Sequence, residues 1–377
     1  MLKISDILKK NRKKKDNNSD SFGENKAAGK DSDKSSEIKK NSKSVKQQDQ
    51  VLSQKKKKES PAVLPAATRK FKNLNNQEAG HVYKEAISLV EQVDTLSSQN
   101  WESFYESAKK IIDRFINILE NDEDSLLRLF FYDYSSLKGY LYQHSVNVCI
   151  LSLFLSQHLK YSKDQLQQMG LIALLHDVGL VKYDDLISLN KRFGQDEYAE
   201  VKKHPINGRN ILEKVNENIP VEILEAICQE HERLDGSGYP HALEGKAISE
   251  KARLIGLIDS YESMMHARPY RDKFKSEDVI KFFTQQKVRF EYKFLKALID
   301  LVGVFPVLTP VKLNTREMGV VIRQNYQMPL KPVIKITHSA QGQKIDSPKA
   351  IDLAVNYSIY VQECFISTKT KDEKKSE

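Results

Sequence analysis

The sequence predicts an all-α helical bundle with a small C-terminal β-rich appendage and a disordered N-terminal tail. Apolar residues recur at helical spacing between residues 76 and 302, which indicates packed helices. Short runs rich in β-branched residues, separated by Asn, Pro and Gly, follow from residue 303. These changes in pattern divide the chain into four parts. We expect a tail (1–75), a helical region (76–135), a main helical domain (136–302) and a β-rich appendage with a disordered end (303–377).

The tail carries the net charge of the protein. Residues 1–60 hold 18 Lys and Arg against 9 Asp and Glu, and their one aromatic residue is Phe22. Residues 61–377 carry 42 charged residues of each sign, so the basic character of the chain does not indicate a nucleic-acid-binding domain. A segment of this composition cannot bury enough apolar surface to offset its ordering entropy. A solvated linker and a weak contact with an anionic lipid or nucleic-acid surface both fit it.

Cysteine usage and hydropathy indicate a cytoplasmic protein. Cys149, Cys228 and Cys364 are far apart and show no CxxC spacing. The first two lie in apolar helical patterns, which predicts buried, reduced thiols. The segment Met1-Leu2-Lys3-Ile4 lacks the apolar core of a signal peptide, and no stretch reaches the ~20 apolar residues of a membrane span.

Start and stop signals place the elements of the main domain and the appendage. Proline suits the first turn of a helix, serine caps it, and glycine follows its end. The expected helices run from His144 to about His158, from Asp164 to Leu175, from Pro205 onward, from Val221 to Glu230 and from Ser249 to Met265, with two more in 276–302. The expected strands contain residues 311–313, 319–322, 333–336 and 358–361.

Histidine and aspartate recur at the ends of these helices, in steps of 32, 27, 27 and 28 residues. Each step equals about one helix plus a connection, so successive helices can deliver ligands to a common point in a bundle core. Imidazole and carboxylate together suit borderline divalent metals, and a paired metal site indicates hydrolysis. The residues that begin or end these steps are His144, His176, Asp177, His204, His231 and Asp259.

Five ordered motif segments lie between Gln143 and about Arg271. They are His144-Ser145-Val146-Asn147-Val148, His176-Asp177-Val178-Gly179, His204-Pro205, His231-Glu232-Arg233-Leu234-Asp235-Gly236-Ser237-Gly238-Tyr239-Pro240 and Arg268-Pro269-Tyr270-Arg271. In their order and spacing they resemble the HD-GYP domain, a branch of the HD phosphohydrolase superfamily. The resemblance implies an all-α bundle with a two- or three-metal centre that hydrolyses cyclic di-GMP to linear pGpG or GMP.

The chemistry of a phosphodiester assigns a role to each candidate ligand. Hydrolysis needs a strong nucleophile and cations near the phosphoryl oxygens, and a hydroxide bridging two divalent metals supplies both. Asp177 is the candidate bridge, because a carboxylate can span two metals where an imidazole cannot. We expect His176 and Asp177 to be catalytic, and iron or manganese to be the metal. His144, His176 and Asp259 would complete one metal site, and His204, Glu230 and His231 would help to hold the other.

Other motif residues are candidates for contacts with the substrate or a partner. Lys182, Arg233, Arg268 and Arg271 would contact phosphate or guanine, although a surface ion pair is the alternative for each arginine. The Gly-Tyr-Pro loop would shape the site and contact protein partners, although a plain tight turn is its default interpretation. Its candidate residues are Asp235, Gly236, Gly238, Tyr239 and Pro240. The chain is also a candidate homodimer.

Three departures from the family pattern leave two functions open. Leu180 stands where the family usually has a lysine, and Glu230 stands where it usually has the first of two histidines. Lys138-Gly139-Tyr140 offers no acidic residue, which favours two metals over three. An active cyclic di-GMP phosphodiesterase is the first hypothesis. The second is a degenerate domain that acts as a nucleotide sensor or a scaffold. A related cyclic dinucleotide or a phosphomonoester is a further candidate substrate.

Overall fold

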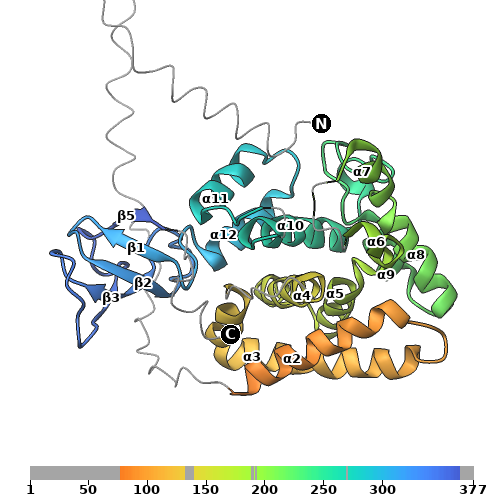
Figure 1. Ribbon diagram of the computed structural model, residues 1–377, viewed down its shortest axis with the longest axis horizontal. Coiled ribbons are helices and arrows are strands. Elements are labelled where there is room, and N and C mark those ends of the chain that lie inside the picture. Colours follow the sequence, from red (N-terminus) through yellow and green to blue (C-terminus); the bar gives the residue numbers. More distant parts are fainter. Residues whose placement is uncertain (1–76, 132–139, 188–190, 192, 269–270, 366–377) are drawn as a thin grey trace, which may run out of the picture. The chain divides into compact units, whose positions relative to one another are not determined.

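The computed structural model of the protein describes residues 77–131, 140–187, 191, 193–268 and 271–365. The tail (1–75), whose disorder the sequence predicts, lies outside the described residues, as do Lys138, Gly139 and the last twelve residues (366–377). The described chain is mainly helical and ends in one small antiparallel sheet, as predicted. Figure 1 shows the helices in colours from orange to cyan and the sheet in blue.

Helix α4 (Tyr140–His158) lies inside the bundle because it has no polar face. Its thirteen residues His144–Ser156 are all buried. A helix that is apolar all round must be covered on every side. Accordingly α2, α3, α5, α10 and α12 all contact α4 (Figure 1).

The other predicted helices begin close to their expected starts, and the structure adds several short helical segments between residues 178 and 247 that were not predicted. The helices other than α4 are α2 (Gln77–Val90), η1 (Glu91–Thr95), α3 (Trp101–Phe131), α5 (Lys163–Leu175), η2 (Val178–Tyr183), α6 (Asp184–Ile187), α7 (Gln195–Val201), α8 (His204–Val215), α9 (Val221–Gln229), η3 (Gly245–Ala247), α10 (Glu250–Met265), α11 (Ser276–Gln285) and α12 (Tyr292–Val302).

Serine side chains cap two of the predicted helices, and the cap at Ser249 is the one that the sequence predicts. Ser162 Oγ accepts from the Gln165 amide at 3.3 Å while the Gln165 side chain accepts from the Ser162 amide at 2.8 Å, so a complete capping box begins α5. Ser249 Oγ accepts from the Ala252 amide at 3.1 Å and caps α10. These local signals fix where the helices that flank the site begin.

The appendage is a five-stranded sheet in the order β4-β3-β2-β1-β5, and all its pairs are antiparallel. The strands are β1 (Pro310–Leu313), β2 (Met318–Arg323), β3 (Val333–His338), β4 (Ala350–Asp352) and β5 (Val361–Cys364).

Two details of the sheet differ from the sequence prediction. The last strand begins at Val361 and does not span 358–361. The reason is Asn314, whose side chain donates to Ser358 O and accepts from the Tyr360 amide, so it takes up bonds that a strand neighbour would make. Strand β4 was not predicted, because three residues carry no detectable alternation.

The cysteines and the helix lengths agree with the sequence analysis. Cys149, Cys228 and Cys364 are all buried and free. Within the described ranges, every helix is too short or too polar to cross a bilayer.

The backbone of α10 lies in direct contact with the backbone of the residues that follow α9, and Gly256 permits this close approach. A Cβ on Gly256 would lie 2.2 Å from the carbonyl oxygen of Glu230. Contacts of this length do not occur in proteins, so the backbone of α10 can lie this close to Glu230 only with glycine at position 256. Gly256 therefore sets the position of one of the predicted ligands.

We predict that Gly256→Ala lowers the free energy of unfolding by about 1–3 kcal/mol or more, because the added methyl group must push two backbones apart. Gly80→Ala is the matched control, since Gly80 lies in α2 with nothing within 4 Å of its missing Cβ. It should gain roughly 0.5–1 kcal/mol from helix propensity. Chemical denaturation of the three proteins measures both effects. A Gly256→Ala protein as stable as wild type would contradict the close approach.

Candidate metal centre

Five helices bring the seven predicted ligands to one point in the bundle. The ligands come from helix interiors, from a helix start and from the residues that directly follow helix ends. His144 lies within α4, His176 and Asp177 follow α5, His204 begins α8, Glu230 and His231 follow α9, and Asp259 lies within α10. Residues more than a hundred positions apart in the chain thus become neighbours.

The first group of donors is His144, His176 and Asp177, whose ligand atoms all lie within 4.8 Å of one another. His144 Nε2 lies 3.3 Å from His176 Nε2 and 3.6 Å from Asp177 Oδ2. Asp259 adjoins this group, because its Oδ1 lies 3.2 Å from His144 Nε2. Two imidazoles and two carboxylates therefore surround one position.

The second group is Asp177, His204, Glu230 and His231, again within 4.8 Å of one another. His204 Nε2 lies 3.4 Å from Asp177 Oδ1, 3.4 Å from Glu230 Oε1 and 3.1 Å from His231 Nε2. Asp177 belongs to both groups. It turns Oδ2 toward the first and Oδ1 toward the second.

Backbone carbonyls fix the orientation of two of the imidazoles. The Nδ1–H of His176 donates to Ala173 O, and the Nδ1–H of His204 donates to Val201 O, each at 2.8 Å. A carbonyl only accepts, so the proton of each ring sits on Nδ1 and the lone pair on Nε2. Both Nε2 atoms face the carboxylates of the cluster, which is the orientation that a metal ligand needs.

Glu230 shows that the donor set fits a metal ion. Its side chain is fully buried, and neither oxygen has a hydrogen-bond partner among the described residues. A buried carboxylate without a partner is costly unless it binds a cation. Nitrogen and oxygen donors of this kind suit divalent iron, manganese and zinc.

Comparisons with known proteins match two parts of the chain. Residues 134–292 match the family model described as HD domain, and residues 310–373 match that of a KOW domain associated with the HD domain. Residues 134–292 belong to the HD domain family. Together with the motif segments and the relatives named below, the match confirms the predicted membership of the HD-GYP and HD phosphohydrolase group. The second match covers the sheet that follows the HD domain.

Several curated relatives of the HD domain carry names of cyclic dinucleotide phosphodiesterases. A cyclic di-GMP phosphodiesterase of Pseudomonas aeruginosa is 31% identical over 57% of this chain and 52% of its own length. One of Borreliella burgdorferi is 28% identical over 51% of this chain and 50% of its own length. A 3'3'-cGAMP-specific phosphodiesterase of Vibrio cholerae is 30% identical over 37% and 32%. The chain thus spans about half, or less, of these relatives.

One solved structure, described as an HDG"Y"P protein from Bdellovibrio bacteriovorus, aligns with 62% of this chain and 74% of that chain. The TM-score is 0.48 and the sequence identity is 19%.

The Gly-Tyr-Pro loop of the HD domain packs against the second donor group. The Tyr239 ring stacks on His231 at a centroid distance of 4.7 Å. Gly238 permits this, since a Cβ there would lie 2.4 Å from the Cα of Glu232. Glu232 in turn accepts from the amides of His241 and Leu243 at 2.7 and 3.0 Å. The loop is therefore held by its backbone against the end of α9.

Asp235, Gly236 and Pro240 shape the turn of the loop. Asp235 accepts from the amide and the hydroxyl of Ser237, which closes a local turn. Gly236 has a positive φ of 70°, and Pro240 follows a cis peptide bond. These backbone features and the local turn define the course of the loop.

The four predicted substrate contacts make protein contacts in the structure. Lys182 Nζ donates to Asn207 Oδ1 at 3.0 Å. The other three are arginines, and each guanidinium bonds carbonyls or side chains of the HD domain itself. Arg233 donates to Glu230 O, Glu232 O and Ser260 Oγ, Arg268 donates to Glu262 Oε2, and Arg271 donates to Ser263 O, His266 O and Asp272 O. Their roles toward a substrate stay predictions.

Three residues around the site were not singled out by the sequence analysis. Glu262 accepts a hydrogen bond from Nδ1 of His144, and Glu232 accepts one from the loop amide of His241. The ammonium of Lys202 lies 5.1 Å from the centroid of the Tyr239 ring. Glu262 could have been found, because it follows Asp259 by three positions and so lies on the same face of a helix. Glu232 and Lys202 gave no such signal, since their roles depend on how the loop folds back.

Burial and neighbouring charges shift the pKa values of the buried groups of this centre in opposite directions. Burial raises the pKa of Glu230 to about 7, even though His176 and His204 lower it. Burial is the largest influence on His144 and lowers its pKa, yet the Glu262 and Asp259 carboxylates together outweigh it and raise that pKa to about 9. Burial raises the pKa of Asp177, but the surrounding imidazoles hold it well below its ordinary value.

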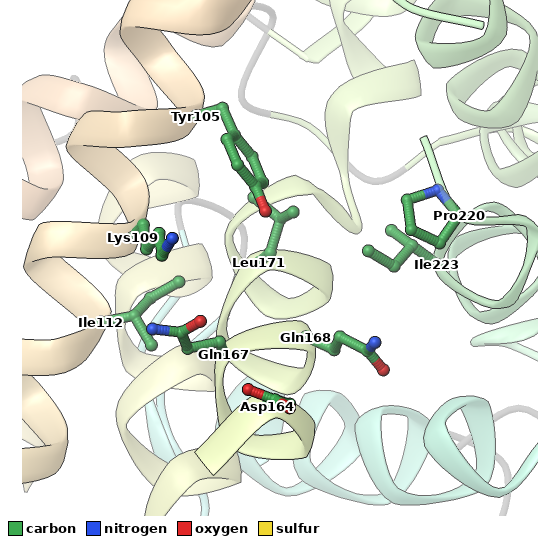
Figure 2. A pocket seen from close by; sticks show the side chains of 9 residues that line it. All are labelled: Tyr105, Lys109, Ile112, Asp164, Gln167, Gln168, Leu171, Pro220 and Ile223. Atoms are coloured by element: carbon green, nitrogen blue, oxygen red, sulfur yellow. The ribbon is translucent and has the colours of Figure 1, made fainter. Parts of the chain in front are cut away.

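A pocket of about 220 Å³ lies apart from these donors, between α3, α5 and the start of α9. Figure 2 shows that both polar and apolar side chains line it, among them Tyr105, Lys109 and Leu171. None of its lining residues is a candidate ligand, so it is not the cavity of the metal centre.

We predict that substitutions at the two donor groups change the metal stoichiometry differently. Asp177→Asn should abolish tight binding at both positions, because both groups share this carboxylate. Glu230→Gln should leave one metal bound, because Glu230 belongs to the second group only. Elemental analysis of each protein after equilibration with Mn(II) measures the stoichiometry. Equal losses in the two variants would contradict the division into two groups.

Metal affinity should rise with pH between the pKa of Glu230, about 7, and that of His144, about 9. Both pKa values are raised, so both groups hold protons at lower pH that a metal must displace. Binding is therefore weak below this range and strengthens as the protons leave. Calorimetric titration of Mn(II) in two buffers of different ionisation enthalpy would count the released protons. A pH-independent affinity would contradict the assignment.

Proposed function

We propose that the HD domain is a metal-dependent phosphodiesterase that hydrolyses cyclic di-GMP. The observation that carries the proposal is the shared carboxylate of Asp177, which serves two adjoining groups of imidazole and carboxylate donors with separate oxygens. Such an arrangement suits a pair of divalent metals, iron or manganese, and not a single ion.

The chain's own residues would hold and orient the reacting parts. Asp177 keeps its negative charge between the two groups, because the pKa of its carboxyl is held low by the imidazoles around it. His176 and His204 hold their rings through backbone carbonyls, so their Nε2 atoms keep a fixed direction. When bound, a metal pair lowers the pKa of a water and withdraws charge from the phosphoryl oxygens. The ring of Tyr239 stacks on His231 and covers one face of its imidazole.

The substrate class rests on the relatives. The names of the Pseudomonas and Borreliella relatives specify cyclic di-GMP, whereas that of the Vibrio relative specifies 3'3'-cGAMP. Both substrates are cyclic dinucleotides with two phosphodiester bonds, so the same metal chemistry serves either. Cyclic di-GMP is the first choice because the relatives that overlap this chain over about half of its length carry that name.

A non-catalytic nucleotide sensor or scaffold is the second candidate, and Leu180 favours it. An apolar side chain at this position cannot contact a phosphate or donate a proton to a leaving group. Lys182, the nearby lysine, donates to Asn207 Oδ1. A domain of this kind would bind metal and nucleotide but release no product.

The protein partners and the cellular location that the sequence predicts are also proposals. Several residues of the Gly-Tyr-Pro loop are partly exposed, and Asp235 is exposed, so a partner protein can reach the loop. The proposed contact of the basic tail with an anionic surface concerns residues outside the described ranges. A homodimer and a cytoplasmic location also stay proposals.

The decisive assay is cyclic di-GMP hydrolysis by the purified full chain, under anaerobic conditions with Fe(II) or Mn(II) added. We expect linear pGpG or GMP as the product, and its loss to the detection limit in Asp177→Ala. Asp164→Ala is the matched control, because Asp164 lies in α5, outside both donor groups, and is exposed. Chromatography of the nucleotides and metal analysis of the same samples provide the measurements.

Three outcomes distinguish the candidates. Turnover of cyclic di-GMP that disappears only in Asp177→Ala supports the enzyme. Faster turnover of 3'3'-cGAMP under the same conditions would move the proposal to that substrate. Two bound metals with nucleotide binding but without product would overturn the enzyme in favour of the sensor.

A further inference from the structure

Glu262 is a buried carboxylate next to the metal centre, and it is not one of the predicted ligands. It is 2% exposed and lies one turn after Asp259 on α10. Its Oε2 accepts from the Nδ1–H of His144 at 2.5 Å. The opposite nitrogen of the same ring, Nε2, faces Asp177 and Asp259. The imidazole of His144 therefore stands between Glu262 and the position that a metal would take.

This contact fixes which nitrogen of His144 is available to a metal. A carboxylate accepts and does not donate, so it holds the ring proton on Nδ1 and leaves the lone pair on Nε2. Histidine ligands of metals usually donate their second nitrogen to a carboxylate or a carbonyl, which raises their basicity and fixes their orientation. His176 and His204 use carbonyls for this purpose, whereas His144 uses Glu262.

Other donors hold Glu262 in place. Arg268 Nη2 donates to its Oε2 at 2.9 Å, and His266 Nδ1 lies 3.0 Å from its Oε1. Asn147 Nδ2 donates to Oε1 at 3.1 Å. Both carboxylate oxygens are therefore engaged, which explains how a charge can be buried here.

The chain of hydrogen bonds continues from Asn147 to the N-terminal helical region. Tyr83 of α2 is 1% exposed, and its hydroxyl donates to Asn147 Oδ1 at 2.8 Å. An amide that accepts on Oδ1 and donates on Nδ2 has a single orientation that satisfies both partners. Tyr83 thus selects the orientation of Asn147 that presents its NH₂ group to Glu262.

We propose that Glu262 is a positioning residue for the metal centre, and that Tyr83 and Asn147 hold its carboxylate in place. Helix α2, which carries Tyr83, then contributes to the geometry of the site. This inference rests on the metal centre of the proposed function. It does not require that the bound metals hydrolyse a cyclic dinucleotide. It assigns to α2, which lies before the HD domain in the sequence, a direct effect on how His144 binds a metal.

The protein offers a matched control for the chain of hydrogen bonds that begins at Tyr83. Tyr261 of α10 is also fully buried, and it lies next to Glu262 in the sequence. Its hydroxyl has no hydrogen-bond partner among the described residues. Tyr83→Phe and Tyr261→Phe therefore remove the same atom from similar surroundings, but only the first breaks the chain of bonds to Glu262.

The experiment measures Mn(II) binding to the metal-free full chain by competition with a chromogenic chelator. We expect Glu262→Gln to weaken binding of at least one Mn(II) by about 10- to 100-fold. Tyr83→Phe should weaken it by about threefold to tenfold, because one buried hydrogen bond is lost. Tyr261→Phe should leave it unchanged. Thermal unfolding of the metal-free proteins supplies the second readout.

Each outcome decides the proposal. A purely structural role for Glu262 would lower the unfolding temperature of the metal-free protein and leave the Mn(II) dissociation constant unchanged, which would overturn the inference. If Glu262→Gln does not fold, the two tyrosine variants decide, and equal affinities in both would also overturn it. A wild-type protein that binds no Mn(II) would overturn the metal centre itself, whereas binding without hydrolysis would leave this test intact.

Discussion

The structure of the candidate site depends on one carboxylate, Asp177, which lies directly after a helix end and faces two groups of donors at once. Its two oxygens point to different imidazoles, so the distance between the groups is set by the width of a carboxylate. Every other donor is arranged around this constraint. Helices α4, α8 and α10 and the end of α9 each contribute groups that only the closed bundle brings together.

The tight approach of backbones is the second requirement of this arrangement. Gly256 lets α10 lie against Glu230, and Gly179 does the same where the chain after Asp177 meets the start of α8. A Cβ on Gly179 would lie 2.0 Å from His204 O. The glycines therefore stand beside the ligands and not in remote turns, and they explain how imidazoles from different helices come within about one atom's width of each other.

Much of the helical fold could be predicted from the sequence, because its signals are local. Ser162, Pro205 and Ser249 act within one turn, and the apolar pattern of α4 is long enough to show burial on all sides. The strands were harder to predict, since a three-residue strand has no period and Asn314 replaces strand bonds from a distance of more than forty residues. Six of the seven candidate ligands could be brought together from the sequence because their spacing follows helix lengths, and Glu230 is the neighbour of one of them.

The surroundings of the ligands could not be predicted in the same way. The orientation of Arg233 toward backbone carbonyls, or of Lys182 toward Asn207, depends on packing between elements that the spacing of residues does not encode. Glu262 and Tyr83 are buried together with Asn147 only because α2, α4 and α10 meet. A polar residue inside an apolar helical pattern is the one signal that a sequence gives for such a network.

The long separation between the donors links metal binding to folding. His144 and Asp259 are 115 positions apart, so a partly folded chain that lacks either α4 or α10 holds no complete site. An ion that binds only the native state stabilises it by mass action, in proportion to the logarithm of the free metal concentration. The supply of metal in the cell would then govern the lifetime of the folded protein against proteolysis as well as the chemistry of its centre.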